Sequence, residues 1–421
     1  MGGEKPSIHL GRPGGPPTVI FNPTLATLQR HLDHLKQVNV SPSTVECASR
    51  YLRCAVMFYE DEAHRQKAIK ELVDGAIGEK AKWTFTLGWA DNIKPDGSWW
   101  YSKIVTREKV RCPTSTALNP LAYICLQFKR FREFCNFPIV LVGATANRLE
   151  ISVAVCVGSI YVSKLLTLDL SLGFHASDNI IRLARIFEVL SDCRKALQRY
   201  YGEVVRLRSP RLSCLFPCPT PVDTSIELPK LTYRQFFSRA GQPTSGLVDL
   251  GNATTTMYTA TLDTDREVIV KFTAHYNEAA HRVLADAQLA PTLHFCERVI
   301  GGLYMVVVDH VVGKSVWQLQ EDDTPVPAIV SKWVDDAVRL LHNKDIVFGD
   351  LRDPNILYVD SDGSVALIDL DWARTDGVSR YPATLNPANA WAEDVFPYGI
   401  MRKAHDIWQM ECLADLCNPD V

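Results

Sequence analysis

The sequence has no uninterrupted apolar run that is long enough to cross a bilayer as a helix. The apolar stretch FPIVLVGATANRLEISVAVCV is broken by Asn147, Arg148 and Glu150 before the roughly 20 residues that a membrane span needs. The first residues, MGGEKPSIHLGRPGGPPTV, lack the apolar core of a signal peptide, and Pro6 breaks the myristoylation pattern. We therefore expect an intracellular protein, cytoplasmic or nuclear, with no membrane partner.

An excess of charge of one sign is also missing. The chain has 45 Lys and Arg against 48 Asp and Glu, a formal net charge of -3, so its average charge does not favour nucleic acid as a partner. The 12 cysteines follow no regular framework, which favours a reducing compartment. Cys214 and Cys218 have no second Cys or His pair nearby, so the sequence does not predict a zinc site.

The chain is too long for one ordinary hydrophobic core. Its 421 residues, 47% hydrophobic and 22% charged, are typical of a globular protein with two domains, or three. A proline-rich stretch without a regular period reads as a linker at 207–231. We predict a flexible tail and leading helix at 1–40, an α/β domain at 41–206, and a second domain at 232–421.

Hydrophobic periodicity predicts a mixture of helices and strands in both domains. In the first domain we expect helices at 41–78 (one or two), 119–134 and 178–204, and strands at 83–89, 98–110, 138–145, 148–157 and 159–166. The second domain places strands before helices, which makes the chain α+β overall. There we expect strands at 247–262, 267–273 and 301–312, helices at 277–288 and 326–342, and a hairpin of 356–359 with 365–373.

Three motifs of the second domain carry charged groups in an order that has a chemical meaning. VIVK ends a strand at Lys271, and GDLRDPN sets Asp350 and Asn355 in a short loop between apolar segments. VALIDLDWA then supplies Asp369 and Asp371, which point to the same side of an extended segment. Together the motifs resemble the protein kinase superfamily, whose sites consist mostly of positioned charge and metal. The resemblance implies a two-lobed, kinase-like fold that uses ATP and Mg²⁺.

The resemblance also assigns roles around the transferred phosphoryl group. Asp350 takes the position of the residue that orients or deprotonates the acceptor hydroxyl, and Arg352 that of a cation on the γ-phosphate. Asn355 and Asp369 take the positions of the Mg²⁺ ligands, and Asp371, in place of a glycine, can face the same metal. We therefore expect Asp350, Arg352 and Lys271 to be catalytic.

A second group of residues is implied to bind the nucleotide. Lys271 would contact the phosphates with Glu278 as its ion-pair partner, and the base would meet the linker 309–313, which includes Asp309 and Val311. The phosphate loop keeps only Gly251 of the expected glycines. Because threonines replace the others at 254–256, the backbone amides approach phosphate less closely, and weak nucleotide binding stays open.

Two departures from typical protein kinases bear on the acceptor. FGD replaces His-Arg-Asp, which removes the partner of an activation-loop phosphate, and no Ala-Pro-Glu element follows Asp369. The main interpretation is transfer to Ser or Thr of a protein. GD before the loop is also similar to aminoglycoside and choline kinases, so a small-molecule acceptor is an alternative, and a pseudokinase that serves as an interaction module is another.

Four motifs taken together support a narrower resemblance: GDLRDPNIL, LIDLDWA, RYPATLNP and HDIWQM. Their combination is similar to that of kinase-like proteins of mushroom-forming fungi, some of which are related to Crinkler-type effectors. In HDIWQM the resemblance makes Asp406 a clamp on the catalytic-loop backbone. It also implies that 41–206 resembles a degenerate restriction-endonuclease fold.

An active nuclease is not the favoured interpretation of that first domain. Asp91 or Asp96 would be the first acid and Lys109 the lysine, but Arg107 stands where the second acid belongs and would repel a metal. We therefore expect a structural or partner-binding remnant. Four tryptophans nearby are interpreted as core and sheet-surface residues: Trp83, Trp89, Trp99 and Trp100.

Overall fold

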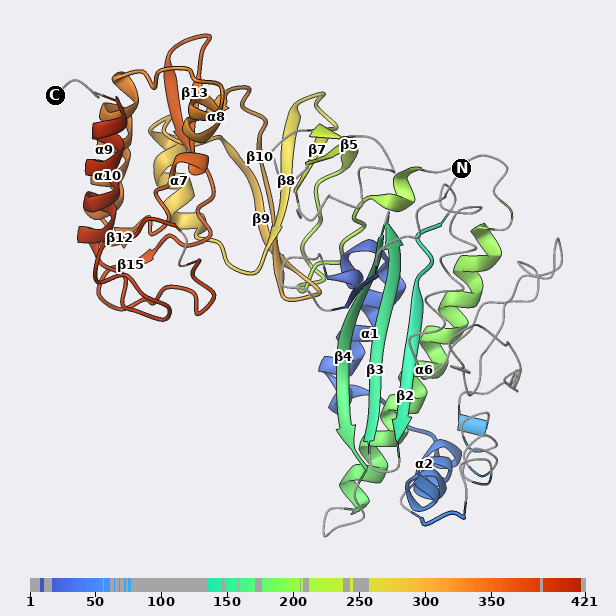
Figure 1. Cartoon of the computed structure of the whole chain (residues 1–421). Helices are drawn as coiled ribbons and strands as arrows, with labels where there is room; N and C mark the ends of the chain where they lie inside the picture. Colours follow the sequence, from blue (N-terminus) through green and yellow to red (C-terminus); the bar gives the residue numbers. More distant parts are fainter. Residues whose placement is uncertain are drawn as a thin grey trace, which may run out of the picture. The chain divides into compact units, whose positions relative to one another are not determined.

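The computed structural model contains helices together with mostly antiparallel sheets, and the chain divides into two compact units (Figure 1). The first unit comprises 1–224, 236–255 and 299–301, and the second comprises 225–235, 256–298 and 302–421. The structure describes residues 8–10, 17–55, 57–60, 64, 68, 72, 75–76, 135–145, 148–157, 159–170, 176–204, 206, 212–237, 243–244, 257–386 and 389–417.

A four-stranded sheet in the order β1-β4-β3-β2 forms the centre of the first unit. Strands β2 (Ile139–Thr145), β3 (Arg148–Val157) and β4 (Ser159–Asp169) make an antiparallel meander, and β1 (Ile8–Leu10) adds in parallel to β4. The meander confirms the three strands predicted there. The short parallel strand was not predicted, because its pairing joins residues far apart in the sequence.

Helices pack on this sheet and on one another. They are α1 (Pro23–Asp33), α2 (Pro42–Ala55) and α6 (Ala176–Val204), with 3-10 turns at Thr18–Phe21, Leu35–Gln37 and Leu212–Leu215. Figure 1 shows α6 running along the sheet as the longest of them. Glu188 of α6 accepts hydrogen bonds from the Thr44 hydroxyl, at 2.6 Å, and the Ser41 amide, at 3.2 Å, and so ties the start of α2 to α6.

Part of the predicted first domain lies outside the described residues. This part includes the strands at 83–89 and 98–110, the helix at 119–134, the candidate nuclease residues Asp91, Asp96, Arg107 and Lys109, and the four tryptophans. The predicted helix at 41–78 is confirmed over the bounds of α2, and the predicted helix at 178–204 begins two residues earlier as α6. The predicted domain boundaries stay predictions.

A largely antiparallel sheet opens the second unit. Its strands lie in the order β5 (Leu231–Phe237), β7 (Met257–Leu262), β8 (Glu267–Thr273), β10 (Leu303–Asp309) and β9 (Leu293–Val299). Helix α7 (Glu278–Asp286) follows β8, and Asn277 caps its first turn. In β8, Val268, Val270 and Phe272 are buried, so the strand period places Lys271 on the opposite face.

The remainder of the second unit surrounds two antiparallel helices. These are α9 (Ile329–His342) and α10 (Lys403–Cys417), and α8 (Val316–Glu321) begins with a capping box at Ser315. Short strands lie beside them: β11 (Lys314–Ser315), β13 (Ile356–Val359) and β14 (Ser364–Leu367) form one sheet, and β12 (Ile346–Val347) pairs with β15 (Arg374–Thr375).

The apolar stripe of α9 explains why this helix is central. Val330, Val334, Val338 and Leu341 recur at helical spacing and are each at most 1% exposed, which is the pattern of a helix buried along one face. The predicted helix at 326–342 and the predicted hairpin after it are thereby confirmed, although β14 ends at Leu367. None of the described helices is both long and apolar enough to span a membrane.

Candidate functional site

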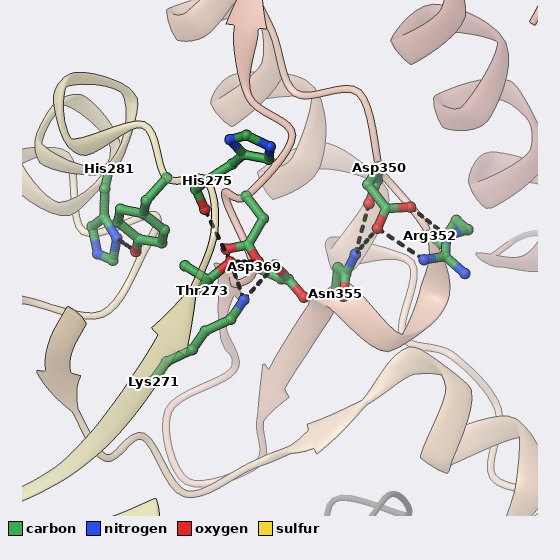
Figure 2. A network of polar contacts seen from close by, with 10 residues as sticks. Lys271, Thr273, His275, His281, Asp350, Arg352, Asn355 and Asp369 are labelled. Carbon is green, nitrogen blue, oxygen red and sulfur yellow. Dashed lines mark hydrogen bonds and ion pairs between the residues drawn. The ribbon is translucent and has the colours of Figure 1, made fainter. Parts of the chain in front are cut away.

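Lys271 is the centre of one cluster of charged side chains in the second unit. Its ammonium lies 2.6 Å from Oδ1 of Asp369 and 2.8 Å from Oδ1 of Asp371, as Figure 2 shows for the labelled pair. Burial by itself lowers the pKa of Lys271, but the two carboxylates outweigh it and hold that pKa above its ordinary value. Lys271 therefore stays charged in a largely buried position.

The two carboxylates come from the segment just after β14. Leu370 between them is fully buried, and the carboxylates of Asp369 and Asp371 both reach the Lys271 ammonium. The predicted extended segment is not formed, because β14 ends at Leu367 and Leu370 and Asp371 lie in a turn. The backbone of Asp369 has φ 64°, a left-handed conformation that is uncommon outside glycine and is found at functional sites. This conformation aims its carboxylate at Lys271.

The same surroundings move the pKa values of the two acids in opposite directions. Burial raises the pKa of both, but at Asp369 the Lys271 ammonium and hydrogen bonds prevail and the pKa lies below its usual range. At Asp371 burial, together with repulsion from Asp369, prevails over Lys271 and raises the pKa to about 6. Asp369 is thus the firmly ionised member of the pair.

Glu278 does not reach this cluster in the structure. It lies at the start of α7 as predicted, but its carboxylate pairs with Arg282 one turn later, at 2.7 Å, and its side chain is 45% exposed. The predicted Lys271–Glu278 ion pair is therefore not formed in the second unit as described. The physical reason is local, since an i,i+4 pair on an exposed helix face forms without any tertiary contact.

Asp350 and Asn355 form a second cluster in the loop between β12 and β13. Asp350 is 5% exposed, and the amide Nδ2 of Asn355 donates to its carboxylate Oδ2 at 3.0 Å and to its backbone carbonyl at 2.8 Å. Arg352 binds both carboxylate oxygens of Asp350 in a bidentate pair. Burial raises the pKa of Asp350, and the bonds from Arg352 oppose this rise without cancelling it.

Figure 2 shows the two clusters side by side, with Asn355 and Asp369 between the outer members. The charge of Asp369 also contributes to the raised pKa of Asp350, which places the two carboxylates within electrostatic reach. The structure therefore brings together Lys271, Asp350, Asn355 and Asp369, residues separated by up to about 100 positions in the sequence.

Gly349 explains the departure from His-Arg-Asp in physical terms. Its φ is 80°, and an added Cβ would lie 3.2 Å from the Trp372 backbone carbonyl and collide with the Met401 side chain. A residue with a Cβ at this position would be strained by the positive φ and would require the Met401 side chain to shift. The backbone conformation and the close approach of Trp372 therefore favour glycine before Asp350.

The backbone of this loop is clamped by α10. Asp406 is fully buried and accepts hydrogen bonds from the amides of Phe348, at 2.8 Å, and Gly349, at 2.9 Å, and from His342, at 2.9 Å. Gln409 on the same helix accepts from the Leu351 amide at 2.9 Å. The geometry agrees with the supporting role expected for Asp406. Gln409 was missed, although its i+3 spacing from Asp406 is the signal that places both on one helix face.

An aromatic cluster lies on the other side of Arg352. The ring of Trp391 lies 5.6 Å from the guanidinium carbon, and it stacks on Trp372 with ring centroids 6.0 Å apart. Tyr381 packs against both rings and binds the His405 imidazole at 3.0 Å. Arg352 is therefore held between a carboxylate and an indole ring, which the sequence motif alone did not indicate.

Asp309, the first residue of the linker predicted to meet the nucleotide base, is bound to neighbouring residues of the sheet. The Asp309 carboxylate accepts from His294 at 2.6 Å and lies 3.5 Å from Arg266, and its backbone amide donates to Thr292 at 3.0 Å. Burial raises the pKa of Asp309, but these partners outweigh it and lower that pKa. Val311 is partly buried. Gly251, the other predicted phosphate contact, lies outside the described residues.

The donor chemistry of the site fits a hard divalent cation bridged by phosphate oxygens. Mg²⁺ prefers oxygen ligands and takes only one or two protein carboxylates when phosphates and waters complete the set. Asp369 supplies an ionised carboxylate. Asn355 donates its hydrogen bonds to Asp350 through Nδ2, so its side-chain carbonyl oxygen is left as a candidate ligand for the cation. Among the described residues, no group of three or more His, Cys, Asp or Glu side chains is arranged to hold a metal ion.

No protein-family model matches the chain, and no curated protein matches it either. Among solved structures it is similar to the kinase PK-1 of Cydia pomonella granulovirus, with 14% sequence identity and a TM-score of 0.32. The match covers 39% of this chain, which spans 64% of that kinase chain. A likeness at this level carries no argument about activity or substrate.

Proposed function

We propose that the second unit is a kinase-like phosphotransferase that moves the γ-phosphoryl group of ATP to a hydroxyl, with Ser or Thr of a protein as the acceptor. The observation that supports this most is the convergence of four residues in one site: the buried Asp350 and Asn355, and the partly buried Lys271 and Asp369. Phosphoryl transfer needs mainly positioned charge, which this set supplies.

Each residue has a role in this proposal that its surroundings suit. Lys271 would neutralise phosphate oxygens, and Asp369 with Asn355 would hold Mg²⁺, which supplies positive charge for the phosphates when bound. Asp350 would accept the proton of the acceptor hydroxyl, a task for which a carboxyl with a raised pKa is suited. Arg352 would move from Asp350 toward the transferred phosphate. Asp309 and Val311 would line the base, and Gly251 the phosphates.

The alternatives predict different acceptors or none. A small-molecule acceptor is favoured by the Gly-Asp sequence before the loop, and an interaction module without turnover by the scarcity of glycines in the phosphate loop. The finer resemblance, to fungal kinase-like and Crinkler-type proteins with a degenerate endonuclease-like domain at 41–206, also stays a proposal. It is supported by the quoted motifs and by the order α2, β2 to β4, α6.

The direct test is to measure ATP binding by calorimetry with and without Mg²⁺, and γ-phosphate transfer to a panel of peptides and hydroxylated metabolites. We expect Lys271→Met to weaken Mg-ATP binding at least about tenfold, because a charge-assisted phosphate contact is lost. Lys344→Met, at an exposed position on the same unit, is the matched control. No ATP binding by the wild type would contradict the proposal. Binding without transfer to any acceptor would favour the interaction module.

The Arg352–Asp350 pair predicts a change in the pH dependence of transfer. Because Arg352 opposes the rise that burial imposes on the Asp350 pKa, Arg352→Gln should raise this pKa further. The ionised form acts as the base, so activity is lost as the pH falls through the pKa, and the acidic limb of the kcat profile should move to higher pH. An acidic limb that stays in place, measured across pH 5 to 9 at saturating Mg-ATP, would contradict the assignment of Asp350 as the base.

A further inference from the structure

We propose that Asp371, fixed by Thr273, is the residue that positions Lys271, in the place that the kinase resemblance gives to Glu278. This inference rests on the proposed function and deepens it. It also replaces the sequence-based interpretation of Asp371 as a magnesium ligand, and it makes Thr273 a positioning residue of the nucleotide site.

Strand β8 and the turn after β14 face each other with two residues each. Lys271 and Thr273 lie two positions apart on one face of β8, and Asp369 and Asp371 lie two positions apart in the turn after β14. Asp371 uses Oδ1 to bind the Lys271 ammonium at 2.8 Å and Oδ2 to accept from the Thr273 hydroxyl at 2.5 Å. The Asp371 carboxylate therefore bridges two side chains of β8, and its bond to Thr273 fixes the orientation in which it binds Lys271.

The Thr273 hydroxyl is directed mainly at Asp371. Its other contact, to the backbone carbonyl of His275, is longer at 3.1 Å, and a hydroxyl carries a single proton. Without this bond one oxygen of a mostly buried carboxylate would lose its donor. The Asp371 carboxylate would then be free to rotate away from the orientation that holds Lys271.

Asp369 is better placed than Asp371 to contact a metal. The Asp371 side chain is 19% exposed and both of its oxygens bond to β8, whereas the Asp369 side chain is 40% exposed and uses Oδ1 for Lys271. The two acids thus have different roles in this inference. Asp369 is accessible to a metal ion, and Asp371 binds the side chains of β8. Glu278 lies apart, in its ion pair with Arg282.

The test uses Thr273→Val in the full chain, since this change removes the hydroxyl without altering charge or shape much. ATP affinity would be measured by calorimetry both in EDTA and in saturating Mg²⁺. We expect a loss of roughly threefold to tenfold in both conditions, because an unfixed lysine side chain must be ordered when phosphate binds. The Mg²⁺ concentration for half-maximal transfer should stay within about twofold of the wild type, since no metal ligand is changed.

Two further variants separate positioning from a general loss of structure. Thr273→Ser keeps the hydroxyl and should restore the wild-type ATP affinity. Thr259→Val is the matched control on the neighbouring strand β7, where the hydroxyl is buried without a partner among the described residues, and it should leave ATP affinity unchanged. Thermal unfolding of every variant would show whether the fold is kept.

Several outcomes would overturn the inference. These are an unchanged ATP affinity in Thr273→Val, a failure of Thr273→Ser to restore it, a loss confined to the Mg²⁺ condition, and a larger loss in Glu278→Gln than in Thr273→Val. A wild type that binds ATP while Thr273→Val is normal contradicts this inference alone. A wild type that binds no ATP contradicts the proposed function and this inference with it.

Discussion

Asp350→Asn is expected to lower the rate of phosphoryl transfer by a factor of about 10² to 10⁴, the range associated with loss of a positioned general base. The change keeps the shape of a side chain that is 5% exposed, and an amide still accepts one bond from Arg352 or Asn355. Only the proton-accepting charge is removed. Because Asp350 does not contact Lys271, ATP affinity should stay within about threefold of the wild type.

Single-turnover transfer and calorimetric ATP binding would be measured on the same preparations. Asp353→Asn is the matched control, since Asp353 lies three residues along the same loop, in the 3-10 turn Asp353–Asn355, and bonds to Gln320 instead of the site. Its turnover should stay close to that of the wild type. Equal losses in the two variants would mean that the loop was disturbed, and full activity in Asp350→Asn would contradict the assigned role.

Asp406→Ala is expected to have the largest effect on stability, lowering the free energy of unfolding by about 3 to 5 kcal/mol. The fully buried carboxylate accepts from the amides of Phe348 and Gly349 and from His342, and alanine would leave these donors without it. An unsatisfied buried donor costs about 1 to 3 kcal/mol. The loop that carries Asp350 would also lose its attachment to α10, so any turnover should fall together with stability.

Urea unfolding followed by circular dichroism and intrinsic fluorescence would measure this change. Asp415→Ala is the control on the same helix, because Asp415 is exposed and its replacement should change stability by less than about 0.5 kcal/mol. A loss below about 1 kcal/mol in Asp406→Ala would show that water or other groups satisfy the loop amides. That result would contradict the view of Asp406 as the clamp.

Local patterns were sufficient for several of the longer regular elements, whereas strands β5 and β9 and helix α8 were not predicted. The apolar spacing of α9, the alternation in β8 and the apolar meander β2 to β4 each encode their own structure, because one face of each element must be buried. The same patterns gave no sign of β1, whose partner β4 is about 150 residues away. Pairing over such a distance is decided by the assembled fold rather than by local preference.

Residues of the candidate site divide in the same way. The positions of Asp350, Asn355 and Asp369 in the chain followed from motif spacing. That Asp369 and Asp371 both reach Lys271 depends on a turn and on the left-handed backbone of Asp369, which the predicted extended segment did not include. Their roles in transfer stay predictions. The partner of Lys271 did not follow from spacing, since Glu278 and Asp371 both stand at plausible distances along the chain.

By itself the sequence determined the types of element and the order in which lysine, aspartate and asparagine enter the second unit. Only the tertiary structure decided that Lys271 pairs with Asp369 and Asp371, that Glu278 pairs with Arg282 instead, and that Gly349 packs closely against the Trp372 backbone. The physical reason is the separation in sequence over which each kind of interaction acts. Periodicity and capping act within a few residues, whereas ion pairs and close packing join segments whose proximity exists only after the chain has folded.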